Sequence, residues 1–403
     1  SNHKLERMIG VLEHSGFGDE AETLGQFLKL VRSTITRNKK QERSTLGTTE
    51  VEKLLGTLRG IDRRKIEEAM YASLKQGILN PVSDRDLLKQ FEVLSRDLKR
   101  YINSLEFSLP QGDHKPLAYA FGYLDPEYED GKKDFALVIK NYHVAGLIHH
   151  MLPEKTLAYS ATIGDAECFG FETGLRGAFT SLESEFAHEK TRIYMPTDTQ
   201  DLAYDSRGNR DVARSLRLVA RSVAKFNMQG LRSLVVLVSE DERQRFLRMC
   251  PEAELNGGAL EAVSYGKGVT AREAAVRFKD GVGDVLVGTV SQYGEGVDLP
   301  NRIAPVIFYL RPAYPNPYEP EAQFEASRYG SRRFAVWNWR VMNDLLQVRG
   351  RNIRSVNDEG VTFLISQQFR KFARPTLPKW LLPAYVADKS MEECVDDAMR
   401  LLV

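Results

Sequence analysis

Long apolar runs, a disulfide framework and a strong net charge are all missing from this 403-residue sequence. No stretch is apolar and long enough to span a bilayer, and no signal peptide is visible, so we expect no membrane partner. The three cysteines, Cys168, Cys250 and Cys394, are too few and too far apart for disulfide pairing, and fit a reducing compartment such as the cytoplasm. A formal net charge of +1 excludes a globally basic protein, so any nucleic-acid site must be a local patch.

Motifs that bind nucleotides or metals are missing as well. The sequence contains no G-x-x-x-x-G-K-S/T, the Walker A loop that holds a nucleotide's phosphates. It contains no Asp-Glu-x-His box, so it has no Walker B carboxylate for Mg²⁺. The seven histidines form no cluster in the sequence, and no metal site is predicted. What is present, 42% hydrophobic and 28% charged residues, is typical of a globular protein of two or three domains.

The apolar pattern changes along the chain. From Leu5 to about Phe107 it has helical spacing, which predicts an all-α region. From about Arg192 onwards helical and strand patterns alternate, which predicts an α/β domain with a mainly parallel sheet. Between these regions we expect two paired strands, Leu117–Leu124 and Phe135–Ile139. A short helix is expected at His143–Leu152, and a further strand at Thr156–Ser160.

A basic stretch closes a helix that we expect to begin near Ala335. In a continuous helix Gln347, Arg351 and Arg354 lie at i, i+4 and i+7, and therefore share one face. No carboxylate lies one turn away, so we expect two surface guanidiniums that contribute little to stability and that face an anion; phosphate matches their fork geometry. Arg349 points to another side of this helix, so Arg349→Ala is expected to affect turnover much less than Arg351→Ala. Gly350, beside the face, weakens the helix.

The segment Gly288–Pro300 places a turn-rich, glycine-containing loop directly after the apolar strand Val285–Val287. Parallel α/β sheets place ligands where a buried strand feeds such a loop. Bases and aromatics also mix between Arg328 and Arg340. This mixture fits either a groove that binds a single strand by stacking or, for Trp337 and Trp339, a core position.

These residues resemble motifs V and VI of superfamily 2 DNA helicases of the XPD/DinG type, which read roughly G-x-x-S/F-x-x-E-G-x-D-x-P and Q-x-x-G-R-x-I-R. Asp358 and Gly360 follow at the family's positions. Tyr159-Ser160-Ala161-Thr162 resembles motif III, the "SAT" sequence that follows a strand. The resemblance covers about residues 105 to 370.

The resemblance implies three regions: a helical arch-like region at 1–107, a remnant of the first RecA-like domain with motif III at 108–190, and a second RecA-like domain at 191–403. It implies an ATP hydrolase that moves 5′ to 3′ on single-stranded DNA, a role in DNA repair, and a location in the bacterial cytoplasm or nucleoid. ATP and Mg²⁺ would be held mainly by residues absent from these 403, so the sequence is expected to be an inactive carboxy-terminal fragment. The three cysteines cannot form the four-cysteine iron–sulfur cluster of such helicases.

The resemblance also assigns roles to single residues. Arg351, Arg354 and Gln347 would act on the γ-phosphate, and Asp298 would contact a motif VI arginine or the nucleotide's sugar. The nucleotide cleft would be contacted by Gly294, Glu295, Gly296 and Gly350. DNA phosphates would be contacted by Ser239, Thr289 and Ser291. The two domains would be coupled through Ser160 and Thr162.

Two alternatives stay open. A non-catalytic nucleic-acid-binding scaffold with a RecA-like fold would explain the missing Walker motifs, although it has no use for two arginine fingers. An unrelated α/β phosphate-ester hydrolase would need a metal or nucleophile cluster that the sequence does not display.

Overall fold

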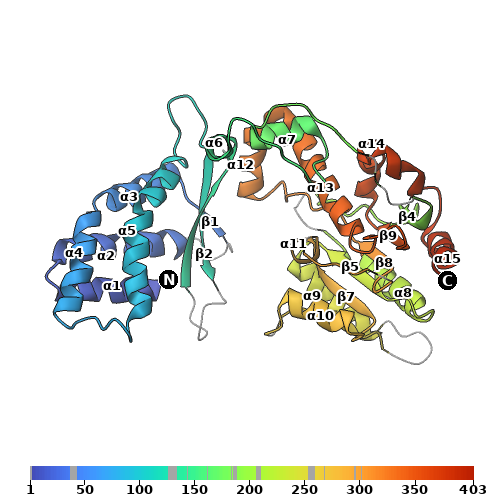
Figure 1. Ribbon diagram of the computed structural model, residues 1–403, viewed down its shortest axis with the longest axis horizontal. Coiled ribbons are helices and arrows are strands. Elements are labelled where there is room, and N and C mark those ends of the chain that lie inside the picture. Colours follow the sequence, from blue (N-terminus) through green and yellow to red (C-terminus); the bar gives the residue numbers. More distant parts are fainter. Residues whose placement is uncertain are drawn as a thin grey trace. The chain divides into compact units, whose positions relative to one another are not determined.

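The computed structural model describes residues 2–36, 43–125, 134–142, 144–160, 162–182, 184, 188–205, 210–252, 259–266, 268–294, 296–300 and 302–403. The chain divides into two compact units, Ser1–Met151 and Leu152–Val403, each with its own hydrophobic core (Figure 1). No helix in these ranges has the length and apolarity needed to cross a membrane.

The first unit packs helices against a small antiparallel sheet. Its elements are α1 (Asn2–His14), α2 (Gly18–Thr36), β1 (Arg43–Thr45), α3 (Thr48–Arg59), α4 (Arg63–Lys75), α5 (Arg85–Glu106), β2 (Ala118–Asp125), β3 (Asp134–Asn141) and α6 (Val144–Met151). The predicted helical region and the predicted pairing of β2 with β3 are confirmed. In α5 the buried residues Leu87, Phe91, Leu98 and Leu105 follow helical spacing, so this helix forms one wall of the core.

The β2–β3 hairpin belongs to the first unit. Ala120 lies in the helical core, and a Cβ built on Gly122 would come within 2.4 Å of the Ile35 side chain on α2. Only a residue without a side chain lets α2 approach the hairpin so closely. Packing therefore divides the chain between residues 151 and 152. The division at 107/108 and 190/191 does not coincide with it and stays a prediction about family regions.

The second unit is an α/β domain built on a parallel sheet. Its elements are α7 (Ala166–Thr173), β4 (Thr191–Tyr194), α8 (Ala213–Asn227), β5 (Ser233–Leu237), α9 (Glu240–Met249), β6 (Ala262–Ser264), α10 (Ala271–Lys279), β7 (Val285–Thr289), α11 (Val290–Tyr293), β8 (Val306–Tyr309), α12 (Pro320–Tyr329), α13 (Arg333–Arg349), β9 (Gly360–Leu364), α14 (Ala373–Thr376), β10 (Tyr385–Val386) and α15 (Met391–Leu402). The strand order is β10-β4-β9-β8-β5-β7-β6, and every pairing is parallel. The predicted α/β fold with a parallel sheet is confirmed.

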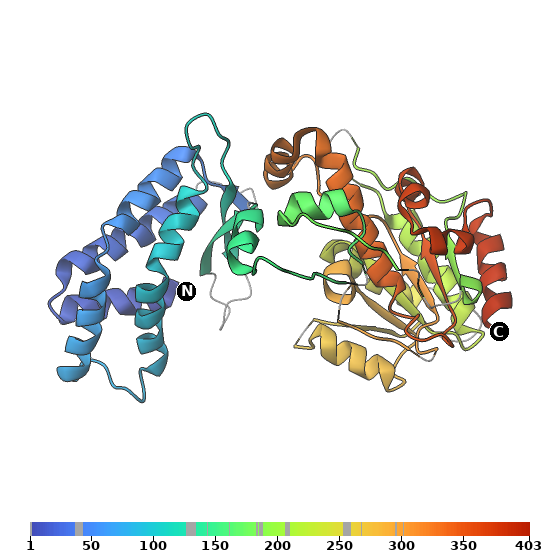
Figure 2. The ribbon, with the colours of Figure 1, turned by 45° about the horizontal axis from the view of Figure 1, so that its top comes forward.

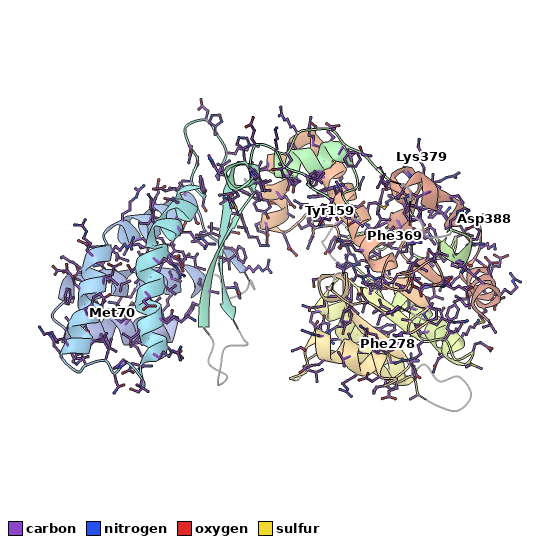
Figure 3. All side chains as sticks on the ribbon, in the orientation of Figure 1. Met70, Tyr159, Phe278, Phe369, Lys379 and Asp388 are labelled. Atoms are coloured by element: carbon purple, nitrogen blue, oxygen red, sulfur yellow. The ribbon has the colours of Figure 1, made fainter. Side chains whose placement is uncertain are left out.

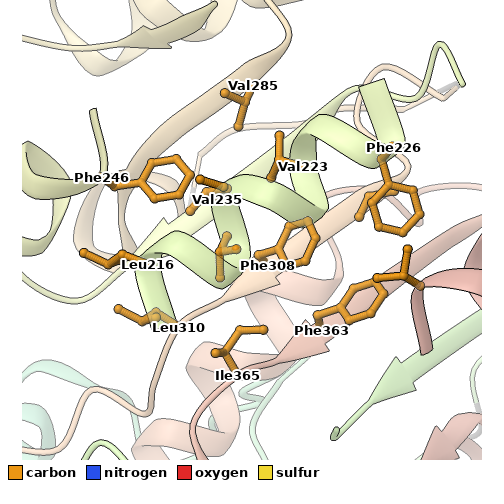
Figure 4. Close-up of a cluster of buried hydrophobic side chains, with 14 of the residues drawn as sticks. Leu216, Val223, Phe226, Val235, Phe246, Val285, Phe308, Leu310, Phe363 and Ile365 are labelled. Atoms are coloured by element: carbon orange, nitrogen blue, oxygen red, sulfur yellow. The ribbon is translucent and has the colours of Figure 1, made fainter. Parts of the chain in front are cut away.

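Helices cover both faces of this sheet (Figure 2). One face packs against α8, α9 and α15, and Phe308 stacks on Phe363 there with ring centroids 4.9 Å apart (Figure 4). The other face packs against α10 and α13. Because both faces are covered, the strands β5, β7, β8 and β9 are buried throughout, and each large apolar side chain contributes about 1.5–3 kcal/mol through burial.

The predicted strand at Thr156–Ser160 does not form. Residues 156–160 have no regular secondary structure; Leu157 is 86% exposed, and Tyr159, which is labelled in Figure 3, is 88% exposed. A strand is stable only when a neighbour completes its hydrogen bonds. In the described part of the chain no strand pairs with this segment.

Candidate functional site

The helix α13 ends earlier than predicted. Its last residue is Arg349, and Gly350 caps it with φ −64° and ψ −2°. The prediction that Arg351 and Arg354 share a helical face with Gln347 is therefore wrong. Beyond this end, Asn352 is 2% exposed, and its Nδ2 donates to the Pro305 carbonyl at 2.9 Å. This bond fixes the chain at the amino-terminal edge of the sheet and turns it towards β9.

Arg351 is buried rather than on the surface, with 7% exposure. Its Nε donates to the Gln347 carbonyl at 2.9 Å, and its Nη1 donates to the Val297 carbonyl at 2.9 Å. Its own carbonyl accepts from the Leu299 amide at 2.9 Å. The side chain and backbone of Arg351 thus join the two segments that sequence analysis singled out. Arg351 is therefore not a surface cation, and we now expect its buried hydrogen bonds to contribute to stability.

Asp298 is the acidic residue of this site. One of its carboxylate oxygens forms an ion pair with Arg354 Nη2 and lies 3.7 Å from Arg351 Nη1. The predicted contact between Asp298 and a motif VI arginine is confirmed. The side chains of Asp298 and Arg354 are 60% and 38% exposed, so solvent and solutes can reach this pair.

The backbone of Arg354 is held by a residue that sequence analysis did not rank as functional. Asp358, 6% exposed, accepts the backbone amides of Arg354 and Ser355 on one oxygen, each at 2.7 Å. A Cβ on Gly360 would approach the Asn352 amide to 2.5 Å, so glycine is required beside that anchor. The signal in the sequence is an Asp three to four residues after the amides it binds, which is typical of turns.

The glycines assigned to the nucleotide cleft have local structural reasons. A Cβ on Gly294 would meet the Val290 carbonyl at 2.4 Å, and Gly296 has φ +78°, which favours glycine. Gly350 lies under the Leu346 carbonyl, which a Cβ would approach to 3.2 Å. Glu295 lies outside the described residues. The contact of these three glycines and of Glu295 with a nucleotide stays a prediction.

The three hydroxyl residues predicted to bind DNA phosphate lie at the carboxyl edge of the sheet. Leu237 and Thr289 are register partners in β5 and β7, so Ser239 and Ser291 each follow a strand end by two residues. The Ser239 hydroxyl already caps α9 by accepting from the Glu242 amide at 3.2 Å. Thr289 is 5% exposed and lies 3.0 Å from the exposed Ser291 hydroxyl. This edge is opposite the one that carries Arg354.

Motif III lies against α13. Gln347 Nε2 donates to Thr162 Oγ1 at 3.4 Å, and Ser160 Oγ accepts from the Thr162 amide at 3.3 Å. The structure therefore brings together Gln347 and Thr162, which sequence analysis had assigned to different motifs. Their predicted role in coupling is not tested by this contact.

Two aromatic residues of the stretch between Arg328 and Arg340 lie in the core. Trp337 and Tyr329 are 6% and 7% exposed, and Arg340 forms ion pairs with Glu325 and Glu172, each at 2.5 Å. Phe334 differs, because it is 59% exposed. Of the aromatic residues in this stretch, Phe334 is the one available for stacking.

Arg349 is also buried, with 4% exposure. Its Nε and Nη2 have no hydrogen-bond partner among the described atoms, and the guanidinium lies 5.5 Å from the Trp380 ring. Burial lowers the pKa of Arg349 to about 10. This charge costs free energy in the folded state.

Arg349→Met is expected to raise the free energy of unfolding by about 1–3 kcal/mol, since Met keeps the apolar stem and removes unsatisfied donors. Urea denaturation of the wild type and the variant measures it. A lower midpoint in the variant would mean that Arg349 has a partner that stabilises the fold.

Comparison with known proteins follows this geometry. Residues 224–384, which include Gly288–Pro300 and the stretch that carries Arg351 and Arg354, match the helicase C-terminal domain family. A probable ATP-dependent helicase of Methanocaldococcus jannaschii is 26% identical over 228 residues, which cover 52% of this chain and 34% of the relative. This chain thus spans about a third of the length of that relative.

Two solved structures share the fold. One titled XPD helicase has a TM-score of 0.51 at 16% identity and covers 91% of this chain and 61% of its own. One titled XPD apo has a TM-score of 0.52 at 17% identity and covers 91% and 69%. Residues 224–384 are therefore similar to a helicase C-terminal domain, and the chain shares the fold of the two structures titled XPD helicase and XPD apo.

Proposed function

We propose that this chain is the part of an ATP-dependent DNA helicase that supplies the arginine side of the ATP cleft and part of the path for a single strand. The observation that carries the proposal is the solvent-accessible ion pair between Arg354 and Asp298, held in place by buried contacts. The proposal is tested by ATP hydrolysis stimulated by single-stranded DNA in a helicase that contains this chain.

Arg354 and Arg351 have different roles in this proposal. Arg354 is the arginine finger, since a γ-phosphate can displace the exposed carboxylate of Asp298 from its planar fork. The buried Arg351 side chain donates hydrogen bonds to the Gln347 and Val297 carbonyls, and it thereby fixes the loop that carries Asp298. Gln347 accepts Arg351 Nε on its backbone carbonyl, and its side chain orients groups in the cleft. Arginine fingers accelerate phosphoryl transfer by roughly 10³–10⁵-fold.

Mg²⁺ and the phosphate-binding loop are assigned to residues outside these 403. The sequence has neither Walker motif, and among the described residues no group of three or more His, Cys, Asp or Glu side chains could hold a metal ion. When bound elsewhere, Mg²⁺ would neutralise charge on the β- and γ-phosphates. In this chain Arg354 would neutralise the remaining charge.

The carboxyl edge of the sheet is assigned to the nucleic acid. Ser291 is exposed there beside Thr289, and hydroxyls and amides hold phosphates without reading sequence. Phe334, with the Arg333 guanidinium 4.4 Å from its ring, adds a platform for stacking a base. The preference for DNA, movement from 5′ to 3′, a role in DNA repair and a bacterial cytoplasmic or nucleoid location are parts of this proposal.

This chain is expected to bind single-stranded DNA weakly and without sequence preference, because its contacts go to phosphates and base faces. Fluorescence anisotropy across a salt series measures it, and log K should fall with a slope of about −0.7 per phosphate neutralised. Affinity that does not change with salt, or that depends on sequence, would contradict phosphate tracking.

A further inference from the structure

A turn that begins at the last residue of motif III, residues 162–164, is fastened to α13 by two side chains. Trp339 Nε1 donates to the Ile163 carbonyl at 2.7 Å. With its amide oriented to satisfy its neighbours, Asn343 donates to the Thr162 carbonyl at 3.0 Å and accepts from Trp339 Nε1 at 3.3 Å. We propose that Trp339 and Asn343 are positioning residues that clamp this turn and hold Thr162 against Gln347.

The turn is shaped to fit the clamp. Gly164 has φ +72°, a conformation that L side chains rarely adopt. A Cβ at this position would also lie 2.8 Å from the Asn343 side-chain amide and 2.9 Å from Trp339 Nε1. Glycine is therefore required twice, once for the backbone and once for the approach of α13.

The helix α7, which follows the turn, is held against α12 and α13 by contacts other than the clamp. The Asp165 side chain caps α7 by accepting from the Cys168 amide at 2.8 Å. Glu172 forms an ion pair with Arg340 on α13, and the Phe171 ring meets the Tyr329 ring edge-on at 5.8 Å. With α7 anchored independently, loss of the clamp releases the turn and leaves the helix in place.

The clamp gives motif III a rigid connection to the helix that leads to the arginine finger. Trp339, Asn343 and Gln347 are spaced by four residues, so they lie along one side of α13. Thr162 therefore moves with Gln347, two turns from Trp339. This consequence rests on the proposed function: nucleic acid whose binding moves motif III would change the position of Gln347, and with it the rate of hydrolysis.

Two tryptophans on α13 make a matched test in this chain. Trp339→Phe removes the N–H that binds the Ile163 carbonyl, whereas Trp337→Phe removes one that binds Glu325 at 3.1 Å. Hydrogen exchange by mass spectrometry should show about fivefold faster exchange in peptides covering residues 162–165 for Trp339→Phe, the factor expected for one lost hydrogen bond. Trp337→Phe should leave those peptides unchanged. Equal exchange in the wild type and Trp339→Phe would overturn the clamp.

Two glycines with the same φ separate the clamp from backbone strain. Gly164 and Gly230 both have φ +72°, but a Cβ on Gly230 would have nothing within 4 Å. Gly164→Ala should therefore speed exchange in residues 162–165, and Gly230→Ala should not. If both alanine variants leave that exchange unchanged, the turn does not depend on the clamp.

Turnover separates a positioning role from a merely structural one. In a helicase that contains this chain and both Walker motifs, Trp339→Phe should reduce the ratio of DNA-stimulated to unstimulated kcat, with single-strand affinity unchanged. Trp337→Phe should keep the wild-type ratio. An unchanged ratio in Trp339→Phe would refute the positioning role. A wild type without any turnover would contradict the proposed function, while the exchange measurements still decide the clamp.

Discussion

Arg354→Ala is expected to lower ATP turnover by about 10³-fold or more in a helicase that contains this chain together with Walker A and B motifs. The reason is that the guanidinium meets charge that develops on the γ-phosphate in the transition state. Arg354→Lys should fail as well, because an ammonium cannot reproduce the planar fork. Phosphate release with saturating ATP and single-stranded DNA measures the effect.

The fold should survive this change. The Arg354 side chain is 38% exposed, and its ion pair with Asp298 is open to solvent, so its loss costs little stability. Arg221, exposed on α8, is the matched control, and Arg221→Ala should keep wild-type turnover. Comparable turnover in Arg354→Ala and the wild type would contradict its assignment as the finger.

Glu242→Gln is expected to lower the free energy of unfolding by about 3–5 kcal/mol, because it leaves buried guanidiniums without a carboxylate. Glu242 is 3% exposed and binds Arg311 Nε at 2.6 Å, with Arg210 Nη1 3.9 Å away. Its other oxygen accepts the Val238 amide at 2.9 Å. Burial, followed by repulsion from Arg311, lowers the pKa of Arg210 to about 10, so this cluster already has one positive charge in excess.

The control for Glu242 is the adjacent carboxylate. Asp241 is 64% exposed and pairs with Arg245 at 2.9 Å on the surface of the same helix, so Asp241→Asn should change stability by less than about 1 kcal/mol. Urea denaturation with a fluorescence readout compares the two variants. Similar midpoints for Glu242→Gln and Asp241→Asn would show that the buried cluster contributes no more than a surface pair.

The pattern of apolar residues in the sequence predicted the main secondary-structure elements and the parallel sheet. Runs such as Val285–Val287 and Val306–Tyr309 are apolar without alternation, which is typical of strands covered on both faces, and both lie in the parallel sheet. The pairing of β2 with β3 followed from two strand patterns joined by a turn-rich segment. The contact of Asp298 with a motif VI arginine followed from the family resemblance.

The details of the site were not predictable from local patterns. Helical spacing continued past Arg349, but the helix ends there with Gly350 as its cap, and a distant bond from Asn352 to the Pro305 carbonyl holds the residues that follow. That bond joins residues 47 apart, and no local propensity contains it. It changes Arg351 from a surface cation into a buried link. Arg349, likewise, is buried because α13 packs beside the segment that carries Trp380.

The central claim is that this chain supplies Arg354 to an ATP cleft that other residues complete. Complementation tests this claim most directly. The purified chain is mixed with a polypeptide that carries the Walker A and B motifs of the same helicase, and phosphate release is measured with ATP, Mg²⁺ and single-stranded DNA. The account predicts negligible turnover for either polypeptide alone, turnover for the mixture, and its loss when the chain carries Arg354→Ala. Turnover by this chain alone, or an undiminished rate in the mixture with Arg354→Ala, would contradict the account.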